Sequence, residues 1–261
     1  MLFRSCLNFA SPEKPEGFWQ FRRAVEGLAD ACEALGTPVI SGNVSFYNET
    51  PERAIYPTPT VGMIGLLPDA GKRVTMGFKN EGDLIYLIGG GEPTLGGSEY
   101  LAVVHGQEVG KPPALDMEAE KRLQAFLREA IDQKLLQSAH DVSDGGLTVA
   151  LAECCISGGR GAWFVHAFSS QQAAGARELF GEANSLAIVS VTWERRDELQ
   201  QLMETMGVPF VAGGYVDKDN LRINAANLSD IQNRLHVAVA DLRAAYEGAI
   251  PAAMTAGAET A

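Results

Sequence analysis

Apolar side chains recur at three- and four-residue steps in two long segments of the chain, and this spacing is typical of amphipathic helices. The first segment covers residues 15–35, where Gly36 and then Pro38 end the pattern because neither residue continues a helix well. The second covers residues 117–136. We therefore expect two long helices, each with one apolar face turned toward a core.

Short apolar runs bounded by Pro, Asp and Gly predict strands elsewhere in the chain. The runs are PVIS (38–41), TVGMIGLL (60–67), DLIYLIG (83–89), AWFVHA (162–167), LAIVSVTW (186–193) and VPFVAGGYV (208–216). The last three alternate with helical patterns at 172–180 and 195–206, and such alternation is typical of an α/β layer. The tail from Ser229 is expected to be helical to about Tyr246 and frayed beyond it.

The order of these elements predicts two domains. Residues 1–136 are expected to form an α+β domain, and residues 137–261 an α/β domain with a helical tail. The chain has 261 residues, of which 46% are hydrophobic, so it can build two ordinary domains that each have a core. No internal repeat of solenoid period is visible.

Charge and apolar run length exclude several classes of partner. A formal net charge of −12 argues against nucleic-acid binding, which favours basic faces. It leaves room for one phosphorylated small ligand, held by backbone N–H groups and Mg²⁺. No apolar run reaches the length of a membrane span. The first residues, MLFRSCLNFASPEKPEG, do not resemble a secretory signal, because their apolar run is too short.

The four cysteines are Cys6, Cys32, Cys154 and Cys155, and no two of them form a C-x-x-C pair. A zinc cluster or a disulfide framework is therefore not expected. Reduced thiols point to a cytoplasmic protein. Cys154 and Cys155 lie within an apolar helical pattern and are expected to be core residues.

A first candidate site is GNVSFYNE (42–49), which follows a predicted strand and carries many oxygen and nitrogen atoms. Gly42 can let a ligand approach the backbone. Asn43 offers a neutral oxygen to a hard cation, and Ser45 can bond a substrate oxygen. The alternative is a polar turn between two strands, since Asn, Ser and Gly favour turns.

A second candidate site is HDVSDGGL (140–147). Asp141 and Asp144 are three residues apart, and Gly145 and Gly146 lead into a helix. Two nearby carboxylates suit Mg²⁺, and a helix N-terminus with glycines suits a phosphate. The alternative is an ordinary N-cap, in which Ser143 or Asp144 caps the helix.

Two further features carry a weaker signal. The stretch GGGEPTLGGSEY (89–100) can cradle a phosphate through free N–H groups, although it matches neither the Walker pattern nor G-x-G-x-x-G, and a surface loop is the alternative. His140 adjoins Asp141 and is the one histidine that we would test. No H-E-x-x-H or G-x-S-x-G pattern is present.

Several longer motifs occur together, in one order: CLNFASPEKPEGFWQF, GTPVISGNVSFYNET, PTPTVGMIGLL, LGGSEYL and SAHDVSDGGLTVALAE. In this order they resemble the C-terminal half of the synthetase subunit of the phosphoribosylformylglycinamidine synthase family (FGAM synthase II), in the aminoimidazole ribonucleotide synthase-like superfamily. The resemblance covers Cys6 to about Met254. It implies a two-domain half, in which a barrel-forming N-terminal domain precedes an α/β domain.

The resemblance also implies an activity. The family is an ATP-dependent C–N ligase of purine biosynthesis that converts formylglycinamide ribonucleotide, ATP and ammonia to formylglycinamidine ribonucleotide. The implied cofactor is Mg²⁺, with ATP as a substrate. The implied partners are the N-terminal half of the same subunit, a glutaminase subunit and a small third subunit. The family's catalytic histidines belong to the first half, so no catalytic residue is assigned in this chain.

By resemblance, Gly42 matches a position that contacts ATP, Asn43 a magnesium ligand and Ser45 a position that contacts the ribonucleotide. Asp141, Asp144, Gly145 and Gly146 are assigned only as phosphate or metal candidates, because the second nucleotide site of the duplicated family has an auxiliary role. These assignments make GNVS the second half's contribution to a composite active site.

Two positions depart from the family pattern. Ser5 stands where the family has an ATP-contacting aspartate, and agreement begins abruptly at Cys6, so we expect a truncated chain in which MLFRS is not family sequence. Ala183 replaces the serine of a Gly-Glu-Ser element, which leaves a ligand role for Glu182 in doubt. Two alternatives stay open: a non-catalytic nucleotide-binding or assembly module, and an independent member of the superfamily such as a small-molecule kinase.

Overall fold

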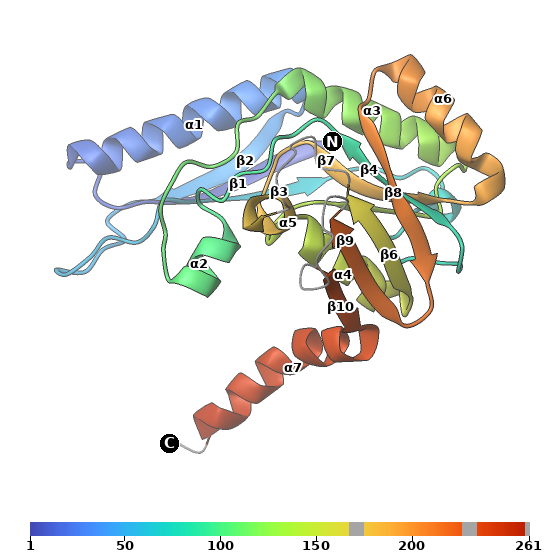
Figure 1. The fold of residues 1–261 in the computed structure, drawn as a ribbon. Helices are drawn as coiled ribbons and strands as arrows, with labels where there is room; N and C mark the ends of the chain where they lie inside the picture. Colours follow the sequence, from blue (N-terminus) through green and yellow to red (C-terminus); the bar gives the residue numbers. More distant parts are fainter. Residues whose placement is uncertain (167–174, 226–233, 259–261) are drawn as a thin grey trace. The chain divides into compact units, whose positions relative to one another are not determined.

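The chain folds into two compact units, Met1–Ala70 and Gly71–Ala261 (Figure 1). The computed structural model describes residues 1–166, 175–225 and 234–258. The division therefore lies between residues 70 and 71, whereas the sequence suggested a boundary between 136 and 137. The reason is β4 (Leu84–Gly89), which pairs with strands far along the chain and so belongs to the second unit.

The first unit is built on a three-stranded sheet in the order β2-β1-β3. The central strand β1 (Leu2–Asn8) runs parallel to β2 (Val39–Ser45) and antiparallel to β3 (Thr58–Ile64). The sequence patterns predicted the outer two strands and missed β1, because polar residues interrupt its short apolar run at the start of the chain.

Helix α1 (Pro15–Leu35) has the bounds that its apolar spacing predicts. Proline occupies its first turn, where its missing N–H costs nothing. Gly36 ends the helix in the left-handed conformation, with φ of 61°, and its N–H bonds the carbonyl oxygens of Cys32 and Glu33. Phe21 of α1 packs edge-on against Phe9 and Phe46, at 5.5 and 5.0 Å between ring centroids.

The second unit contains a seven-stranded sheet in the order β10-β9-β6-β8-β4-β7-β5. Its remaining strands are β5 (Ser138–Asp141), β6 (Gly161–His166), β7 (Leu186–Val191), β8 (Phe210–Asp217), β9 (Asn220–Ala225) and β10 (Arg234–Ala238). Only β6 and β9 pair in parallel, and all other neighbours are antiparallel. The observed layer is thus a mixed, largely antiparallel sheet of the α+β kind, whereas strand–helix alternation suggested an α/β layer.

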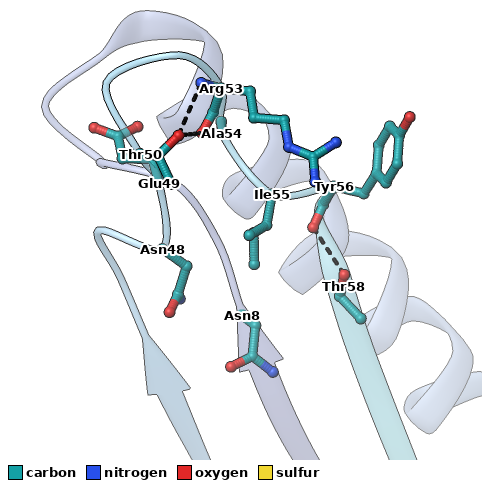
Figure 2. A pocket seen from close by; sticks show the side chains of 9 residues that line it. All are labelled: Asn8, Asn48, Glu49, Thr50, Arg53, Ala54, Ile55, Tyr56 and Thr58. Carbon is teal, nitrogen blue, oxygen red and sulfur yellow. Dashed lines mark hydrogen bonds between the residues drawn. The ribbon is translucent and has the colours of Figure 1, made fainter. Parts of the chain in front are cut away.

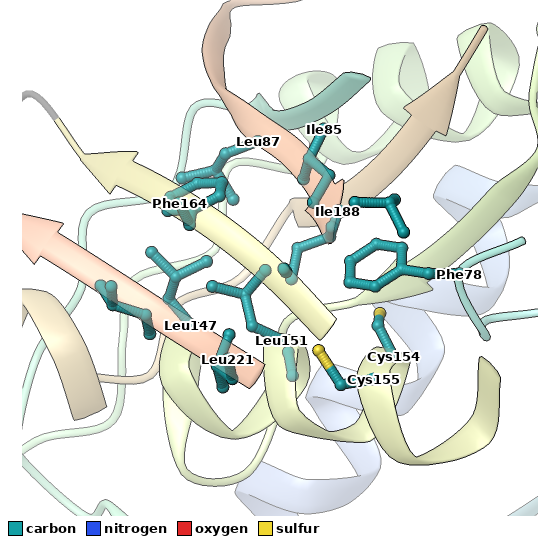
Figure 3. Packing of buried hydrophobic residues seen from close by; sticks show 14 of the residues in the cluster. Phe78, Ile85, Leu87, Leu147, Leu151, Cys154, Cys155, Phe164, Ile188 and Leu221 are labelled. Carbon is teal, nitrogen blue, oxygen red and sulfur yellow. The ribbon is translucent and has the colours of Figure 1, made fainter. Parts of the chain in front are cut away.

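Helices cover both faces of this sheet. Helix α4 (Gly146–Gly158) packs on one face, and α3 (Met117–Asp132) and α6 (Arg196–Met206) pack on the other. The remaining helices are α2 (Glu99–His105), α5 (Ala176–Phe180) and α7 (Val239–Ala258), with 3₁₀ turns at Ala70–Lys72 and Trp193–Arg195. Alternate residues of β4 explain the two cores: Ile85 and Leu87 face α4, whereas Tyr86 and Ile88 face α3 and α6. Figure 3 shows the α4 side, where the helix packs Leu147 and Leu151 against the strands.

The buried cysteines belong to this core, as the sequence predicted. Cys154 and Cys155 of α4 are 1% and 0% exposed, and both side chains pack among the apolar residues that Figure 3 labels. Burial raises the pKa of the Cys155 thiol to about 12 and raises that of Cys154 as well. Both thiols therefore stay protonated and unreactive at neutral pH.

The C-terminal segment differs from its prediction. Residues 234–238 form β10, antiparallel to β9, and the helix that follows runs on to Ala258 rather than fraying after Tyr246. The predicted helix at 172–180 is confirmed over Ala176–Phe180, and its residues 172–174 lie outside the described part of the chain. None of the described helices combines the length and apolar character that crossing a bilayer requires.

Candidate functional site

The site residues that the sequence predicts in GNVS share one face of the first unit's sheet. Strand register places Ser45, Asn8 and Thr58 side by side across β2, β1 and β3. Because side chains alternate along a strand, the next row on the same face is Asn43, Cys6 and Thr60, as the register gives it. Asn43 and Ser45 are thus brought together on a polar face, and neither lies in a turn.

The Asn43 amide is oriented by a sulfur atom. Its Nδ2 donates to Cys6 Sγ at 3.5 Å, and Asn8 Nδ2 donates to the same sulfur at 3.6 Å. With one N–H of Nδ2 donated to the sulfur, the Oδ1 atom of Asn43 is available to a ligand. An amide oxygen of this kind suits a hard cation such as Mg²⁺.

Gly42 of β2 lies on the opposite face of this sheet, where it is in register with Ser5 of β1. A Cβ added at residue 42 would lie 2.5 Å from Ser5 Oγ, so a side chain there would displace the Ser5 hydroxyl. Ser5, which the resemblance aligns with an aspartate, therefore lies beside the position predicted to contact ATP. A serine brings no carboxylate to this contact, and that limits what the first unit alone offers a metal ion.

A hollow opens at the Ser45 end of the polar face (Figure 2). Its volume is about 930 Å³, and Asn8 and Thr58 lie at the ends of β1 and β3 beside it. The remaining lining residues come from the loop between β2 and β3, namely Asn48, Glu49, Thr50, Arg53, Ala54, Ile55 and Tyr56. Three of the segments that the sheet brings together thus line one hollow.

The charges around this hollow are separated. Glu49 accepts a hydrogen bond from Lys14 Nζ at 2.9 Å, and the Lys14 ammonium lowers the pKa of the Glu49 carboxyl. Arg53 has no carboxylate within ion-pair distance among the described residues. Figure 2 shows its side chain extending toward Tyr56, away from Glu49. The hollow therefore presents one available cation and one carboxylate that is already neutralised.

The second candidate site lies in the second unit, where β5 leads into α4. Asp141 ends β5 with its side chain 76% exposed, and Asp144 is exposed in the following turn. His140 lies between two carboxylates, with Nδ1 3.3 Å from Asp141 Oδ1 and Nε2 2.9 Å from Glu153 Oε2. Within the described ranges no three His, Cys, Asp or Glu side chains are grouped as metal ligands.

The backbone conformation and close packing of this turn explain its two glycines. Gly145 and Gly146 adopt φ of 78° and 70°, in the left-handed region that favours glycine. A Cβ at Gly146 would lie 2.4 Å from the carbonyl oxygen of Gly181. Gly145 is the N-cap of α4 and no side chain caps the helix, so the capping by Ser143 or Asp144 that we weighed is not observed.

The anion-binding atoms of both glycine-rich motifs converge on Glu182. Its Oε1 accepts the N–H of Gly145 at 3.0 Å and the N–H of Glu99, at the start of α2, at 2.8 Å. The Glu182 backbone also exchanges two hydrogen bonds with Thr94, each of 2.9 Å. A carboxylate of the chain itself therefore lies where these motifs were expected to cradle a phosphate.

Two family models match the chain with nearly the same division as the structure. The model described as AIR synthase related protein, N-terminal domain, matches residues 1–67, and the corresponding C-terminal domain matches residues 80–225. The chain belongs to the AIR synthase related protein family. Family membership thus accounts for both units, and the match boundaries lie on either side of Ala70.

Curated relatives within this family share the name phosphoribosylformylglycinamidine synthase subunit PurL. The relative from Anaeromyxobacter sp. (strain Fw109-5) is 47% identical over 256 residues, which is 95% of this chain and 32% of the relative. The relative from Gloeobacter violaceus is 59% identical over 159 residues, 59% of this chain and 20% of the relative. The chain thus spans about a third of the length of curated relatives that match it nearly throughout.

Solved structures confirm the AIR synthase-like fold. T. maritima PurL complexed with FGAR covers 93% of this chain and 39% of its own, with a TM-score of 0.71 and 17% identity. T. maritima PurL complexed with ATP gives a TM-score of 0.68 with 18% identity, over 93% of this chain and 37% of its own. At such identities the likeness concerns the fold alone.

The sequence patterns missed most of the hollow. Asn8, Thr58 and Arg53 were not singled out, because they come from segments whose proximity depends on strand register. The asparagine of CLNF and the threonine of PTPT were visible in the motifs. Only pairing of both segments with one central strand brings them to Ser45.

Proposed function

We propose that this chain is the C-terminal half of FGAM synthase II, an ATP-dependent C–N ligase of purine biosynthesis. Its reaction converts formylglycinamide ribonucleotide, ATP and ammonia derived from glutamine to formylglycinamidine ribonucleotide, ADP and phosphate. One observation carries the proposal: 47% identity extends through 95% of the chain to a PurL subunit of which the chain spans 32%.

The first unit contributes Gly42, Asn43 and Ser45 to the composite active site in this proposal. Asn43 and Ser45 project from the same face of β2. A phosphate-bound cation at Asn43 would therefore lie beside a substrate oxygen at Ser45. Mg²⁺, when bound, would neutralise phosphate charge during transfer to the amide oxygen. The polar rows of this face supply no carboxylate, so the acidic ligands of the ion must come from elsewhere.

Asp141 and Asp144 stay candidates for a separate auxiliary cation in the second unit. They are exposed and carry oxygen ligands, which favours Mg²⁺ over softer metals. The amide of Gly145 is already bonded to Glu182, so we assign phosphate contact in this region to the cation and not to the glycine loop.

The N-terminal half of the same subunit is the partner that this proposal requires. Both outer strands of the first unit's sheet, β2 and β3, have a free edge in the described structure. Val44, Val61 and Met63 share the face of buried Phe3 and Leu7, yet they are 41–47% exposed. Free edges and apolar surface favour closure into a barrel by a matching sheet.

Ammonia must reach this site from glutamine, which implies a glutaminase subunit and a small third subunit as further partners. The neighbour described as the structure of PurLQS from Thermotoga maritima is an assembly that contains a similar chain, with a TM-score of 0.67. These partners complete the proposed reaction, in which ammonia displaces phosphate from the activated amide carbon.

Ser5 favours a second candidate function, a non-catalytic nucleotide-binding or assembly module. Its hydroxyl abuts Gly42, at the position where the resembled family carries an ATP-contacting aspartate. If Ser5 weakens the nucleotide contact, the chain can complete a barrel without supporting turnover.

An assay of phosphate release distinguishes the ligase from the non-catalytic module. We would assay the purified chain alone and the chain co-purified with the N-terminal half from a relative, each with ribonucleotide, ATP, ammonia and Mg²⁺. The ligase proposal expects turnover only in the co-purified assembly, because phosphoryl transfer needs both reactants positioned at reacting distance. A stable assembly without turnover would favour the non-catalytic module.

A further inference from the structure

We propose that the hollow beside Ser45 binds a phosphorylated sugar, and that Arg53 binds its phosphate. The assignment of this sugar phosphate to the ribonucleotide substrate rests on the proposed function. The binding chemistry itself rests on lining side chains that Figure 2 shows, among which are acceptors near the strands and one cation on the loop.

The acceptors follow from how the two asparagines are held. Asn48 Nδ2 donates to the carbonyl oxygens of Phe9 and Ser45, at 3.1 and 2.9 Å. Asn8 Nδ2 donates to Cys6 Sγ. Asn48 has thus committed both of its amide N–H groups to the protein and Asn8 one of its two, and the Oδ1 atom of each can accept a hydrogen bond.

Thr58 adds a third acceptor. Its hydroxyl donates to the carbonyl oxygen of Tyr56 at 2.7 Å, so the lone pairs of Oγ1 remain for a ligand. Three acceptors in a hollow that Arg53 also lines suit a ligand that donates several hydrogen bonds and carries no positive charge of its own. Neighbouring hydroxyl groups of a sugar meet this requirement.

The Arg53 guanidinium indicates that the ligand also carries an anionic group. Arg53 is an exposed arginine without an ion pair in the described part of a chain whose net charge is −12. Its guanidinium presents a planar fork of donors that matches phosphate oxygens. Glu49 does not compete for it, because Lys14 already pairs with that carboxylate. Acceptors that bind sugar hydroxyls and a guanidinium that binds phosphate together favour a sugar phosphate as the ligand.

Continuity with Ser45 indicates which sugar phosphate this is. Ser45 and Thr58 both lie in register with Asn8, so the hollow extends the row that ends on Ser45. Ser45 is the residue proposed to contact the ribonucleotide, whereas Gly42, the proposed ATP contact, lies on the other face. We therefore assign the hollow to the ribose phosphate of the ribonucleotide and not to that of ATP.

Calorimetric titration of the full chain with ribose 5-phosphate tests the binding chemistry. We expect Arg53→Gln to weaken binding by about tenfold or more, the loss typical of a charge-assisted hydrogen bond, and Arg53→Lys to recover part of it. Arg128→Gln, at an exposed arginine of α3, is the matched control and should bind normally. Ribose without phosphate and inorganic phosphate without ribose should both bind more weakly.

Several results would overturn the proposal: no binding of ribose 5-phosphate to the unaltered chain, equal binding by Arg53→Gln, or equal affinity for inorganic phosphate. In the co-purified assembly, Arg53→Gln should raise KM for the ribonucleotide and leave KM for ATP unchanged, and the reverse would overturn the assignment to substrate. An inactive assembly whose chain still binds ribose 5-phosphate through Arg53 would refute the proposed function alone.

Discussion

At the scale of single residues, the most informative contact is the pair of amides that donate to Cys6. A thiol among polar side chains at the centre of a sheet has no packing role of the kind that Cys154 and Cys155 have in the second unit. Its sulfur accepts from Asn43 and Asn8 and so decides which atom each amide offers outward. Cys6 is thus a positioning residue for the proposed magnesium ligand.

Replacing Cys6 with alanine should raise the Mg²⁺ concentration for half-maximal turnover of the co-purified assembly by about tenfold, because the Asn43 carboxamide is then free to rotate. Cys6→Ser, which keeps an acceptor, should restore most of the normal Mg²⁺ requirement. The measurement is turnover against Mg²⁺ concentration at saturating ATP.

Cys32→Ala provides the control for this prediction, since Cys32 is a half-buried cysteine of α1 away from the polar face. An unchanged Mg²⁺ requirement in Cys6→Ala would show that Asn43 keeps its orientation without the sulfur.

At the scale of elements, Glu182 joins segments that are remote in sequence. Residues 99 and 145 lie 83 and 37 positions away, and one carboxylate oxygen binds the N–H groups of both. The start of α2, the start of α4 and the loop before β7 therefore meet at this side chain. The glycines of these segments allow close packing around the Glu182 carboxylate.

Glu182→Ala should lower the free energy of unfolding by about 1–3 kcal/mol, because the N–H groups of Gly145 and Glu99 lose their acceptor. Glu182→Gln retains an oxygen and should lose less. Urea unfolding measures both, with the exposed Glu204→Ala as control. Faster amide exchange at Gly145 is expected in Glu182→Ala, and unchanged exchange would contradict the role.

Asp83 makes the turn before β4 sensitive to pH. The side chain is 4% exposed and accepts from Asn80 N and Nδ2, and burial raises the pKa of its carboxyl. The folded state therefore keeps the proton to higher pH than the unfolded chain does. Stability is greatest below the unfolded pKa of about 3.9 and falls as pH rises to the raised folded value.

Asp83→Asn should flatten this dependence, because the amide does not ionise. Urea unfolding at a series of pH values across that window measures it. Asp219→Asn, at an exposed aspartate, should leave the slope unchanged. An equal slope in Asp83→Asn and the unaltered chain would assign the pH dependence to other groups.

Elements defined within one segment could be predicted from the sequence, whereas those that depend on distant pairing could not. The bounds of α1 were predictable because apolar spacing and the Gly36 stop act within one segment. The antiparallel pairing of β4 with β7 and β8 was not, because alternation along a strand does not encode the direction of its neighbours. The same limit applies to the site: Asn43 and Ser45 were visible in one motif, whereas Arg53 and the Glu182 contacts depend on distant pairing.

At the scale of the whole molecule, the first unit's sheet is the least complete part of the structure. Among the described residues, nothing pairs with either outer strand of this sheet. Ile64 of β3 is 75% exposed, and Leu66, which follows the strand, is 92% exposed. Surface of this kind is uncommon on proteins that act alone. The incompleteness matches a chain that spans about a third of its relatives.

The purified chain should self-associate, and the N-terminal half of a close relative should relieve this, because pairing covers the exposed edges and apolar side chains. Size-exclusion chromatography with light scattering measures both samples. Oligomers alone and a defined one-to-one complex with the other half are expected. A monomer that ignores the other half would contradict this expectation.

The two free edges are not equivalent, since β2 runs parallel to the central strand and β3 runs antiparallel to it. When copies of one chain join the β3 edge of one to the β2 edge of the next, each addition exposes a fresh edge, and growth has no geometric end. A partner sheet with two edges of its own seals both seams at once and stops growth at a single ring. In mixtures of the purified chain with such a partner sheet, we therefore expect the ratio of the two to decide between a finite particle and a filament.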